Sequence, residues 1–327
     1  MKKRIFGKTG AEVSEVGLGC WQLGGADWGD VSDEKALGIL AAAVEAGVTF
    51  FDTADVYGNG RSESLIGRFL KQTSEPIFVA TKLGRMQDLY PDKYSESGVR
   101  NAIEASLRRL DVEALDLTQL HCVPTAVMRQ GEIFEWLRKC QKEGKIKSFG
   151  ASVESMDEAL LCLEQPDLAS LQIIFNLFRQ KPIVSLFPHA KEKEVAIIVR
   201  LPLASGLLSG KINKETKFAP TDHRSYNRDG QQFNVGETFA GLPFERGVEL
   251  SEDLRDFVPQ ALTMAQFAQR WILDHEEVSV IIPGATSTDQ ARANASISDL
   301  PPLSQPLHER LANYYQAKVH PLIRGPY

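Results

Sequence analysis

Short runs of apolar and β-branched residues alternate with amphipathic segments from one end of the chain to the other. The run at residues 77–81 has the length and composition of a buried strand, whereas Val99, Ile103, Leu107 and Leu110 recur at the spacing that lines one face of a helix. Strand-like runs return at intervals of roughly 30 residues, the length of one strand with its crossover helix. They predict eight strands, at residues 16–19, 49–52, 77–81, 115–120, 146–151, 171–175, 196–201 and 278–282.

This repetition of strand and helix is typical of α/β proteins with a parallel sheet. Capping-box patterns mark two helix starts, Ser-Met-Asp-Glu at residues 155–158 and Thr-Met-Ala-Gln at residues 263–266. Eight strands can close into a barrel or form an open, doubly wound sheet, and the count together with the absence of a mid-chain linker favours closure. We therefore predict an α/β fold, a (β/α)8 or TIM barrel, in which residues 1–327 form a single domain.

Two segments depart from this repetition. Near the start of the chain, Lys8-Thr9-Gly10 forms a predicted turn between two short alternating segments, which indicates an N-terminal β-hairpin that closes the bottom of the barrel. A stretch rich in Gly, Asn, Asp and Arg at residues 211–258 separates the seventh strand from its helix, and a loop of this length is usually a lid or a binding loop. We expect a partly ordered lid there.

The composition is that of a globular protein, with 43% hydrophobic and 24% charged residues. A net charge of -6 argues against sequence-independent binding of nucleic acid, which needs a clustered excess of Lys and Arg. No stretch is long enough to span a bilayer, and no apolar run follows the basic start to serve as a signal peptide. Cys20, Cys122, Cys140 and Cys162 are widely spaced, without a CxxC pair. We expect reduced thiols, no bound metal, no membrane or nucleic-acid partner, and a cytoplasmic location.

Polar side chains follow three of the predicted strands at their carboxyl ends, where a barrel has its active site. Asp52 ends the second strand and Tyr57 follows in the same loop, whereas Lys82 ends the third strand and His121 the fourth. A Tyr with an ordinary pKa of about 10 is a weak proton donor, and Lys82, kept charged by Asp52, would lower the pKa of Tyr57. His121 would orient a carbonyl oxygen or share the proton. The four residues together suit acid catalysis of carbonyl reduction.

Each of these residues, taken alone, has an ordinary structural interpretation. An Asp after a strand often caps the next turn, and a single Lys is usually solvated. A lone His is more often structural than catalytic, and a lone Tyr usually packs with its hydroxyl bonded. The prediction of an active site therefore depends on the four side chains converging on one face of the barrel.

The segment Gly-Val-Thr-Phe-Phe-Asp-Thr-Ala-Asp-Val-Tyr-Gly-Asn-Gly-Arg-Ser-Glu at residues 47–63 resembles the signature of the aldo-keto reductase superfamily, in the form found in its bacterial and channel-β-subunit-like branch. Further agreement around residues 150–152, 202–211 and 282–294 extends the resemblance over nearly the whole chain. The resemblance implies a catalytic tetrad with a tyrosine general acid, formed by Asp52, Tyr57, Lys82 and His121. It also implies NADPH as cofactor, with NADH as the alternative, bound by Ser152, Gln172, Arg200, Leu203, Ser205, Gly206, Lys211, Gly284, Ala285, Thr286, Ser287, Gln290 and Asn294.

The sequence departs from the pattern of that family at several positions. Val153 stands where many relatives have Asn, and Cys122 where many have a large aromatic residue. Arg200 takes the place of an aromatic ring that stacks on the nicotinamide in many members, and a guanidinium plane can stack too. The Lys and Arg that usually grip a 2′-phosphate are replaced by Thr286 and Ser287, which leaves the choice between NADPH and NADH open.

The resemblance implies an enzyme that transfers a hydride between a nicotinamide cofactor and an aldehyde, ketone or sugar alcohol. One alternative is a cofactor-binding regulatory subunit with little turnover, because channel β subunits share the fold and the tetrad. Another is a barrel hydrolase or isomerase that uses the same Asp and Lys differently. Five further residues either line a substrate pocket or serve as rim packing and solvated loop: Trp21, Trp28, Asp55, Arg224 and Tyr226.

Overall fold

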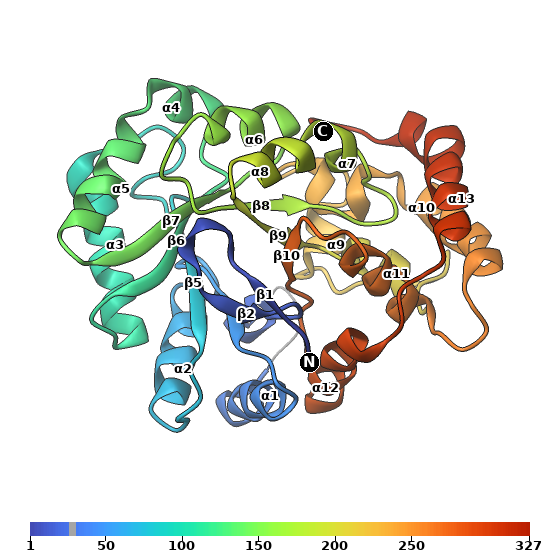
Figure 1. Cartoon of the computed structure of the whole chain (residues 1–327), viewed down its shortest axis with the longest axis horizontal. Helices are drawn as coiled ribbons and strands as arrows, with labels where there is room; N and C mark the ends of the chain where they lie inside the picture. Colours follow the sequence, from blue (N-terminus) through green and yellow to red (C-terminus); the bar gives the residue numbers. More distant parts are fainter. Residues whose placement is uncertain (26–30) are drawn as a thin grey trace.

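The computed structural model describes residues 1–25 and 31–327, and Figure 1 shows their arrangement. Eight parallel strands form one sheet in which each strand neighbours the next one along the chain. All eight strands predicted from the sequence are present, with closely similar bounds. They are β3 Leu18–Gly19, β4 Phe50–Asp52, β5 Phe78–Leu83, β6 Leu115–His121, β7 Ile146–Ser152, β8 Ser170–Ile174, β9 Ala196–Arg200 and β10 Val278–Ile281.

The sheet closes on itself between its first and last strands. The backbone N–H of Gly17 donates to the carbonyl of Ile281 at 2.8 Å, and the N–H of Ile281 donates to the carbonyl of Glu15 at 3.0 Å. A parallel bridge between Val16 and Ile281 lies in the same seam. Closure removes the unpaired edges that an open sheet would expose, and it confirms the predicted (β/α)8 barrel.

The longer helices surround the barrel on its outside (Figure 1). Thr263 and Gln266 form the predicted capping box before α11. Before α6 the prediction is half correct, because Ser155 caps the helix but the Glu158 carboxylate accepts from the N–H of Glu154 instead of that of Ser155. None of the helices in the described part of the chain has the length and apolar character of a membrane span. The helices are α1 Asp33–Glu45, α2 Arg61–Leu70, α3 Glu96–Leu110, α4 Thr125–Gln130, α5 Glu132–Lys142, α6 Met156–Leu163, α7 Pro182–Ser185, α8 Phe187–Glu192, α9 His223–Tyr226, α10 Phe244–Asp253, α11 Met264–Leu273, α12 Thr288–Ala295 and α13 Gln305–Tyr314.

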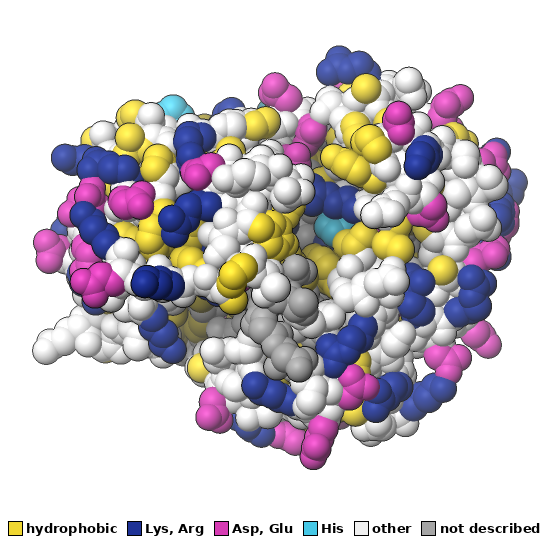
Figure 2. All heavy atoms as spheres, turned by 180° about the vertical axis from the view of Figure 1, so that it is seen from behind, with side chains coloured by type: hydrophobic (Ala, Val, Ile, Leu, Met, Phe, Trp, Pro, Cys, Tyr) yellow, Lys and Arg dark blue, Asp and Glu magenta, His cyan; other side chains and the backbone are white. Residues whose placement is uncertain are grey.

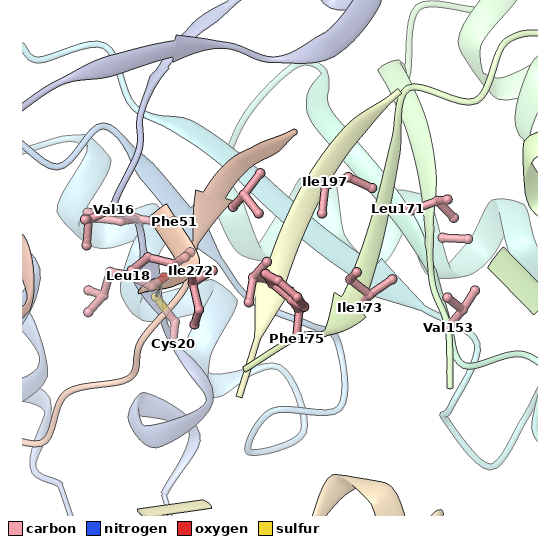
Figure 3. Packing of buried hydrophobic residues seen from close by; sticks show 14 of the residues in the cluster. Val16, Leu18, Cys20, Phe51, Val153, Leu171, Ile173, Phe175, Ile197 and Ile272 are labelled. Carbon is pink, nitrogen blue, oxygen red and sulfur yellow. Dashed lines mark hydrogen bonds between the residues drawn. The ribbon is translucent and has the colours of Figure 1, made fainter. Parts of the chain in front are cut away.

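The strands contribute side chains to two separate apolar clusters. One cluster packs strands against helices, and Figure 3 shows part of it around Phe51, Leu171, Ile173 and Ile197. The other fills the barrel interior, as expected for a closed barrel that is a packed core and not a pore. Its buried members are Phe6, Val13, Phe50, Ala80, Leu117, Ala169, Ala196, Ile198, Val280 and Ile282.

An N-terminal hairpin covers one end of this interior cluster. Strands β1 (Lys3–Ile5) and β2 (Glu12–Ser14) pair antiparallel around the predicted turn. The ring of Phe6 lies 5.6 Å from the ring of Phe50 in β4. A β-carbon added to Gly7 would lie 2.5 Å from a backbone oxygen just before β9, so the turn fits closely against the amino ends of the strands. The predicted hairpin and its place at the bottom of the barrel are confirmed.

Replacing Phe6 with Ala is expected to lower the free energy of unfolding by about 3–5 kcal/mol, because the substitution leaves a cavity in the barrel interior. The Phe6 side chain is fully buried, whereas the neighbouring Ile5 is 56% exposed and provides a matched control. Urea unfolding should give a lower midpoint for Phe6→Ala with an unchanged slope, and little change for Ile5→Ala. Equal losses at the two positions would show that the hairpin is not a plug.

The long segment between β9 and α11, predicted as a partly ordered lid, contains several short helical turns. Besides α9 and α10 it holds η5 (Val235–Glu237) and η6 (Phe239–Gly241). The buried Arg179 donates to the carbonyl of Ala240 at 3.0 Å, and its guanidinium lies 4.3 Å from the ring centroid of Tyr327. The segment around Tyr327 therefore helps to hold η6 against the barrel.

Candidate active site

A cleft of about 710 Å³ opens at the carboxyl ends of the strands. Figure 2 shows a face of the molecule that is hollowed near its centre, with a histidine side chain visible among hydrophobic and basic ones. Asp52, Tyr57 and His121 line the cleft, whereas Lys82 is buried at 1% exposure and is not part of its wall. All predicted cofactor residues except Ser287 line it, namely Ser152, Gln172, Arg200, Leu203, Ser205, Gly206, Lys211, Gly284, Ala285, Thr286, Gln290 and Asn294.

Lys82 has a partner for each of its three N–H groups. It donates to Asp52 Oδ1 at 2.5 Å, to the carbonyl of Thr53 at 2.7 Å and to the Tyr57 hydroxyl at 3.4 Å. Asp52 ends β4 and Lys82 lies in the adjacent β5, where the parallel register brings the two side chains together. The structure thus joins the predicted aspartate, lysine and tyrosine in one hydrogen-bonded group.

Burial and these contacts set the charge states of the group. Burial favours the neutral amine, but the Asp52 carboxylate and Tyr57 outweigh it and raise the pKa of Lys82. Burial also raises the pKa of Tyr57, and this effect exceeds the opposing influence of the Lys82 ammonium. The prediction that the pKa of Tyr57 is lowered is therefore wrong in its net direction, because it left out the loss of solvent around the phenol.

His121 ends β6, and its ring meets that of Tyr57 edge-on with the centroids 5.9 Å apart. Burial, together with the positive charges of Arg85, Lys82 and Arg200, holds the pKa of His121 well below its ordinary value. The imidazole is therefore neutral at physiological pH. Within the described residues its Nδ1 atom has no hydrogen-bond partner. A neutral imidazole can donate one hydrogen bond and accept another, which suits it to orient a substrate oxygen.

A hydrogen-bonded chain links Asp52 to the predicted nicotinamide residues. Asp52 Oδ2 accepts from Gln172 Nε2 at 2.7 Å and from Gln119 Nε2 at 3.3 Å. The Ser152 hydroxyl donates to Gln172 Oε1 at 3.5 Å. Gln172 thus has a structural partner in addition to its predicted role, and Gln119 is a member of the site that sequence reasoning missed.

The predicted pyrophosphate residues lie in and next to η4 (Ala204–Ser209), directly after β9. Residues 204–206 have left-handed φ values of 48° to 100°. Successive backbone N–H groups in such a turn can form an anion-binding concavity. The Ser205 hydroxyl donates to the carbonyl of Glu237 at 3.1 Å and accepts from the N–H of Phe239 at 3.2 Å. The backbone of this turn, and not the serine hydroxyl, is therefore the better candidate ligand.

The predicted adenosine end of the cleft is the loop after β10 and the start of α12. Gln290 Oε1 accepts from the N–H of Thr286 at 2.7 Å. Ser287 caps α12 by accepting from the N–H of Gln290 at 3.2 Å, which explains why its side chain is absent from the cleft wall. Arg292, the only cation in residues 284–294, donates to Glu45 at 2.9 Å on the protein surface. This segment offers no basic side chain to the cleft.

A group of charges that sequence reasoning missed lies beside Cys122. Arg85 donates to Glu154 at 2.7 Å and to Glu237 at 3.4 Å, and Arg200 lies 3.5 Å from Glu237. Glu237 comes from the long loop, where no periodic pattern marks it, so only the folded path of the loop reveals it. Cys122, Glu154 and Glu237 offer ligand atoms within 4.8 Å of one another. Because two guanidinium groups already neutralise these carboxylates, we interpret the group as ion pairs and not as a metal site.

The five candidates for a substrate pocket fall into three groups. Trp21 and Arg224 line the cleft, and the ring of Trp21 stacks on that of Tyr57 with the centroids 5.9 Å apart. Asp55 and Tyr226 do not line it, and burial raises the pKa of Asp55 to about 7. Trp28 lies outside the described residues.

Comparison with known proteins gives matches over most of the chain. The aldo/keto reductase family model matches residues 15–315. Aldo-keto reductase YhdN of Bacillus subtilis is 28% identical over 91% of this chain and 89% of its own, and probable aldo-keto reductase 1 of Glycine max is 33% identical over 86% and 80%. An NADH-specific methylglyoxal reductase of Escherichia coli is 27% identical over 90% and 93%. The structure of a glycerol dehydrogenase from Gluconobacter oxydans matches with a TM-score of 0.79 at 28% identity, covering 99% of this chain and 98% of that one.

Proposed function

Since the chain belongs to the aldo/keto reductase family, a family of NAD(P)H-dependent enzymes, we propose that it transfers a hydride between NADPH or NADH and an aldehyde, ketone or sugar alcohol. Tyr57 is the general acid in reduction and the general base in oxidation. The observation that carries this proposal is the contact of the Lys82 ammonium with both Asp52 and the Tyr57 hydroxyl, beside the neutral His121 at the floor of the cleft.

The cleft fits an extended nicotinamide dinucleotide, which supplies or accepts the hydride when bound. Its wall runs from Tyr57 through η4 to the start of α12. Ser152 and Gln172 would hold the carboxamide, and the Arg200 guanidinium would lie against the nicotinamide ring. The Ser287 cap takes the N–H of Gln290, so the N–H groups of Thr288 and Asp289 at the start of α12 are the ones that suit an anion. The other proposed contacts are Leu203, Ser205, Gly206 and Lys211 at the pyrophosphate, and Gly284, Ala285, Thr286, Gln290 and Asn294 at the adenosine end, whereas Ser287 serves as the cap of α12.

In reduction, Tyr57 gives its phenolic proton to the substrate oxygen as negative charge develops there. The raised pKa keeps the phenol protonated at neutral pH. The resulting tyrosinate is stabilised by the Lys82 ammonium, which Asp52 keeps charged. His121 positions the carbonyl oxygen by donating a hydrogen bond from its neutral ring. In oxidation the same groups act in the reverse order.

Titration with NADPH and with NADH, followed by a carbonyl-dependent assay of cofactor oxidation, tests this proposal. We expect saturable binding and turnover with some members of a panel of small aldehydes and ketones. Tight binding with very slow turnover would favour the alternative of a cofactor-binding regulatory subunit. Absence of nucleotide binding would favour a barrel hydrolase or isomerase and would reject the proposal.

The adenosine end gives a separate prediction. Because Arg292 bonds to Glu45 on the surface, Arg292→Gln is expected to leave the Kd for NADPH unchanged. Lys211 lines the cleft, so Lys211→Gln should weaken the binding of NADPH and NADH alike. Quenching of tryptophan fluorescence measures both constants. If Arg292→Gln lost affinity for NADPH but not for NADH, the Arg292 side chain would have to turn toward a 2′-phosphate.

We further propose that residues 1–327 act as one catalytic unit in the cytoplasm. The cleft draws on residues from Gly19 to Asn294, so a much shorter piece of the chain would lack part of it. All four cysteines are free and buried, which suits a reducing compartment.

A further inference from the structure

Four buried or half-buried charged side chains meet beside the proposed nicotinamide site, and each comes from a different element. Arg85 follows β5, Glu154 follows β7, Arg200 ends β9 and Glu237 ends η5 in the long loop. Arg85 contacts both glutamates, whereas Arg200 contacts only Glu237 among the acidic side chains described. Glu237 is therefore the one carboxylate that links the loop to the residue proposed to face the nicotinamide.

The carboxylate of Glu237 lies between the two arginines. Its Oε2 atom is 3.5 Å from Arg200 Nη1, and its Oε1 atom is 3.4 Å from Arg85 Nη2. Burial would favour the protonated acid, but the two guanidinium groups hold the pKa of Glu237 below its ordinary value. On its other side, Arg200 donates to the carbonyl of Val153 at 3.1 Å. Arg200 is thus fixed by an ionised group from the loop and by a backbone oxygen from the barrel.

The backbone of Glu237 contacts the proposed pyrophosphate turn. Its carbonyl accepts from the Ser205 hydroxyl at 3.1 Å, and the same hydroxyl accepts from the N–H of Phe239 at 3.2 Å. Ser205 has a left-handed φ of 55°, so the turn it belongs to needs such contacts to keep its shape. Glu237 therefore contacts Arg200 at the nicotinamide end of the proposed cofactor site and Ser205 at its pyrophosphate end.

We propose that Glu237 is a positioning residue for the cofactor. Its side chain sets the orientation of the Arg200 guanidinium at the nicotinamide end, and its backbone fixes the Ser205 turn at the pyrophosphate end. The two ends of the site are then ordered together with the loop between β9 and α11. This inference rests on the proposed function, because it takes Arg200 and Ser205 as cofactor contacts.

The test compares Glu237→Gln with Glu154→Gln, which removes a carboxylate from the same group without removing a partner of Arg200. Each variant is titrated with NADPH and with 2′-phospho-ADP-ribose, a probe that lacks the nicotinamide ring, or with NADH and ADP-ribose if the wild type prefers NADH. We expect Glu237→Gln to weaken NADPH binding roughly tenfold, as for a lost charged partner, and to leave binding of the probe unchanged. We expect Glu154→Gln to resemble the wild type in both titrations. Weaker binding of both ligands by Glu237→Gln, or equal losses in the two variants, would overturn the positioning role.

A double-mutant cycle with Arg200→Met tests whether Glu237 acts through Arg200. If it does, adding Glu237→Gln to Arg200→Met produces no further loss of NADPH affinity, whereas independent effects would add. Additive losses would overturn the inference. If the wild-type protein itself binds neither NADPH nor NADH, the proposed function fails. If it binds and turns over while Glu237→Gln matches it, only the positioning role fails.

Discussion

Tyr57→Phe is expected to lower turnover by a factor of about 10² to 10⁴, the contribution that a positioned general acid usually makes. The substitution removes only the hydroxyl, whose contact with Lys82 at 3.4 Å places it in the proton-donor position. The ring and its stacking partner Trp21 remain, so the cleft keeps its shape. The Kd for NADPH should therefore stay at the wild-type value while single-turnover hydride transfer is slowed.

Tyr94→Phe is the matched control for this experiment. Tyr94 donates its hydroxyl to the carbonyl of Gly84 at 2.8 Å and does not line the cleft. The same chemical change at that position should leave turnover close to that of the wild type. If Tyr57→Phe turned over as fast as Tyr94→Phe, Tyr57 could not be the general acid, and the proton would have to come from His121 or from solvent.

The barrel could be predicted from the sequence because each strand carries its own local signal. The run at residues 77–81 became β5, and the other seven runs became strands in the predicted order. The hairpin around the turn Lys8-Thr9-Gly10 followed from a local pattern as well. The Ser155 capping box failed in part because a neighbouring N–H, that of Glu154, competed for the Glu158 carboxylate. Such a competition depends on geometry that sequence spacing does not contain.

The convergence of Asp52, Lys82 and His121 was also predictable, because the carboxyl ends of adjacent parallel strands meet at one rim. The net direction of the Tyr57 pKa was not, because it depends on how completely the surrounding side chains exclude water. Glu237 could not be found either. Its place beside Arg200 depends on the path of the loop after β9, and that path depends on distant contacts such as the one between Arg179 and Ala240.

Asp52→Asn is expected to lower the free energy of unfolding by about 3–5 kcal/mol at neutral pH, the usual effect of breaking a buried ion pair. Both partners are almost fully buried, and Asp52 is the only carboxylate within salt-bridge distance of Lys82 among the described residues. In the wild type, Asp52 raises the pKa of Lys82, so the stabilisation from this pair persists through neutral pH and is lost only as the pH rises through that raised pKa. Without Asp52, Tyr57 is the group that still opposes the effect of burial, so the pKa of Lys82 is expected to fall.

The pH dependence of stability in the variant should therefore have the opposite sign. At neutral pH, Lys82 of the variant is protonated in the unfolded chain. In the folded chain it either loses this proton or keeps it at a cost in folding free energy. Raising the pH toward the ordinary lysine pKa of about 10.4 should therefore recover stability. Urea unfolding between neutral and alkaline pH measures this trend. Glu96→Gln, which removes the acid of the exposed Lys139 pair, should change stability little at any pH. A variant that lost stability with rising pH in parallel with the wild type would show that Asp52 does not control the charge of Lys82. In that case the turnover of Asp52→Asn should also be normal, because Lys82 would still be charged beside Tyr57.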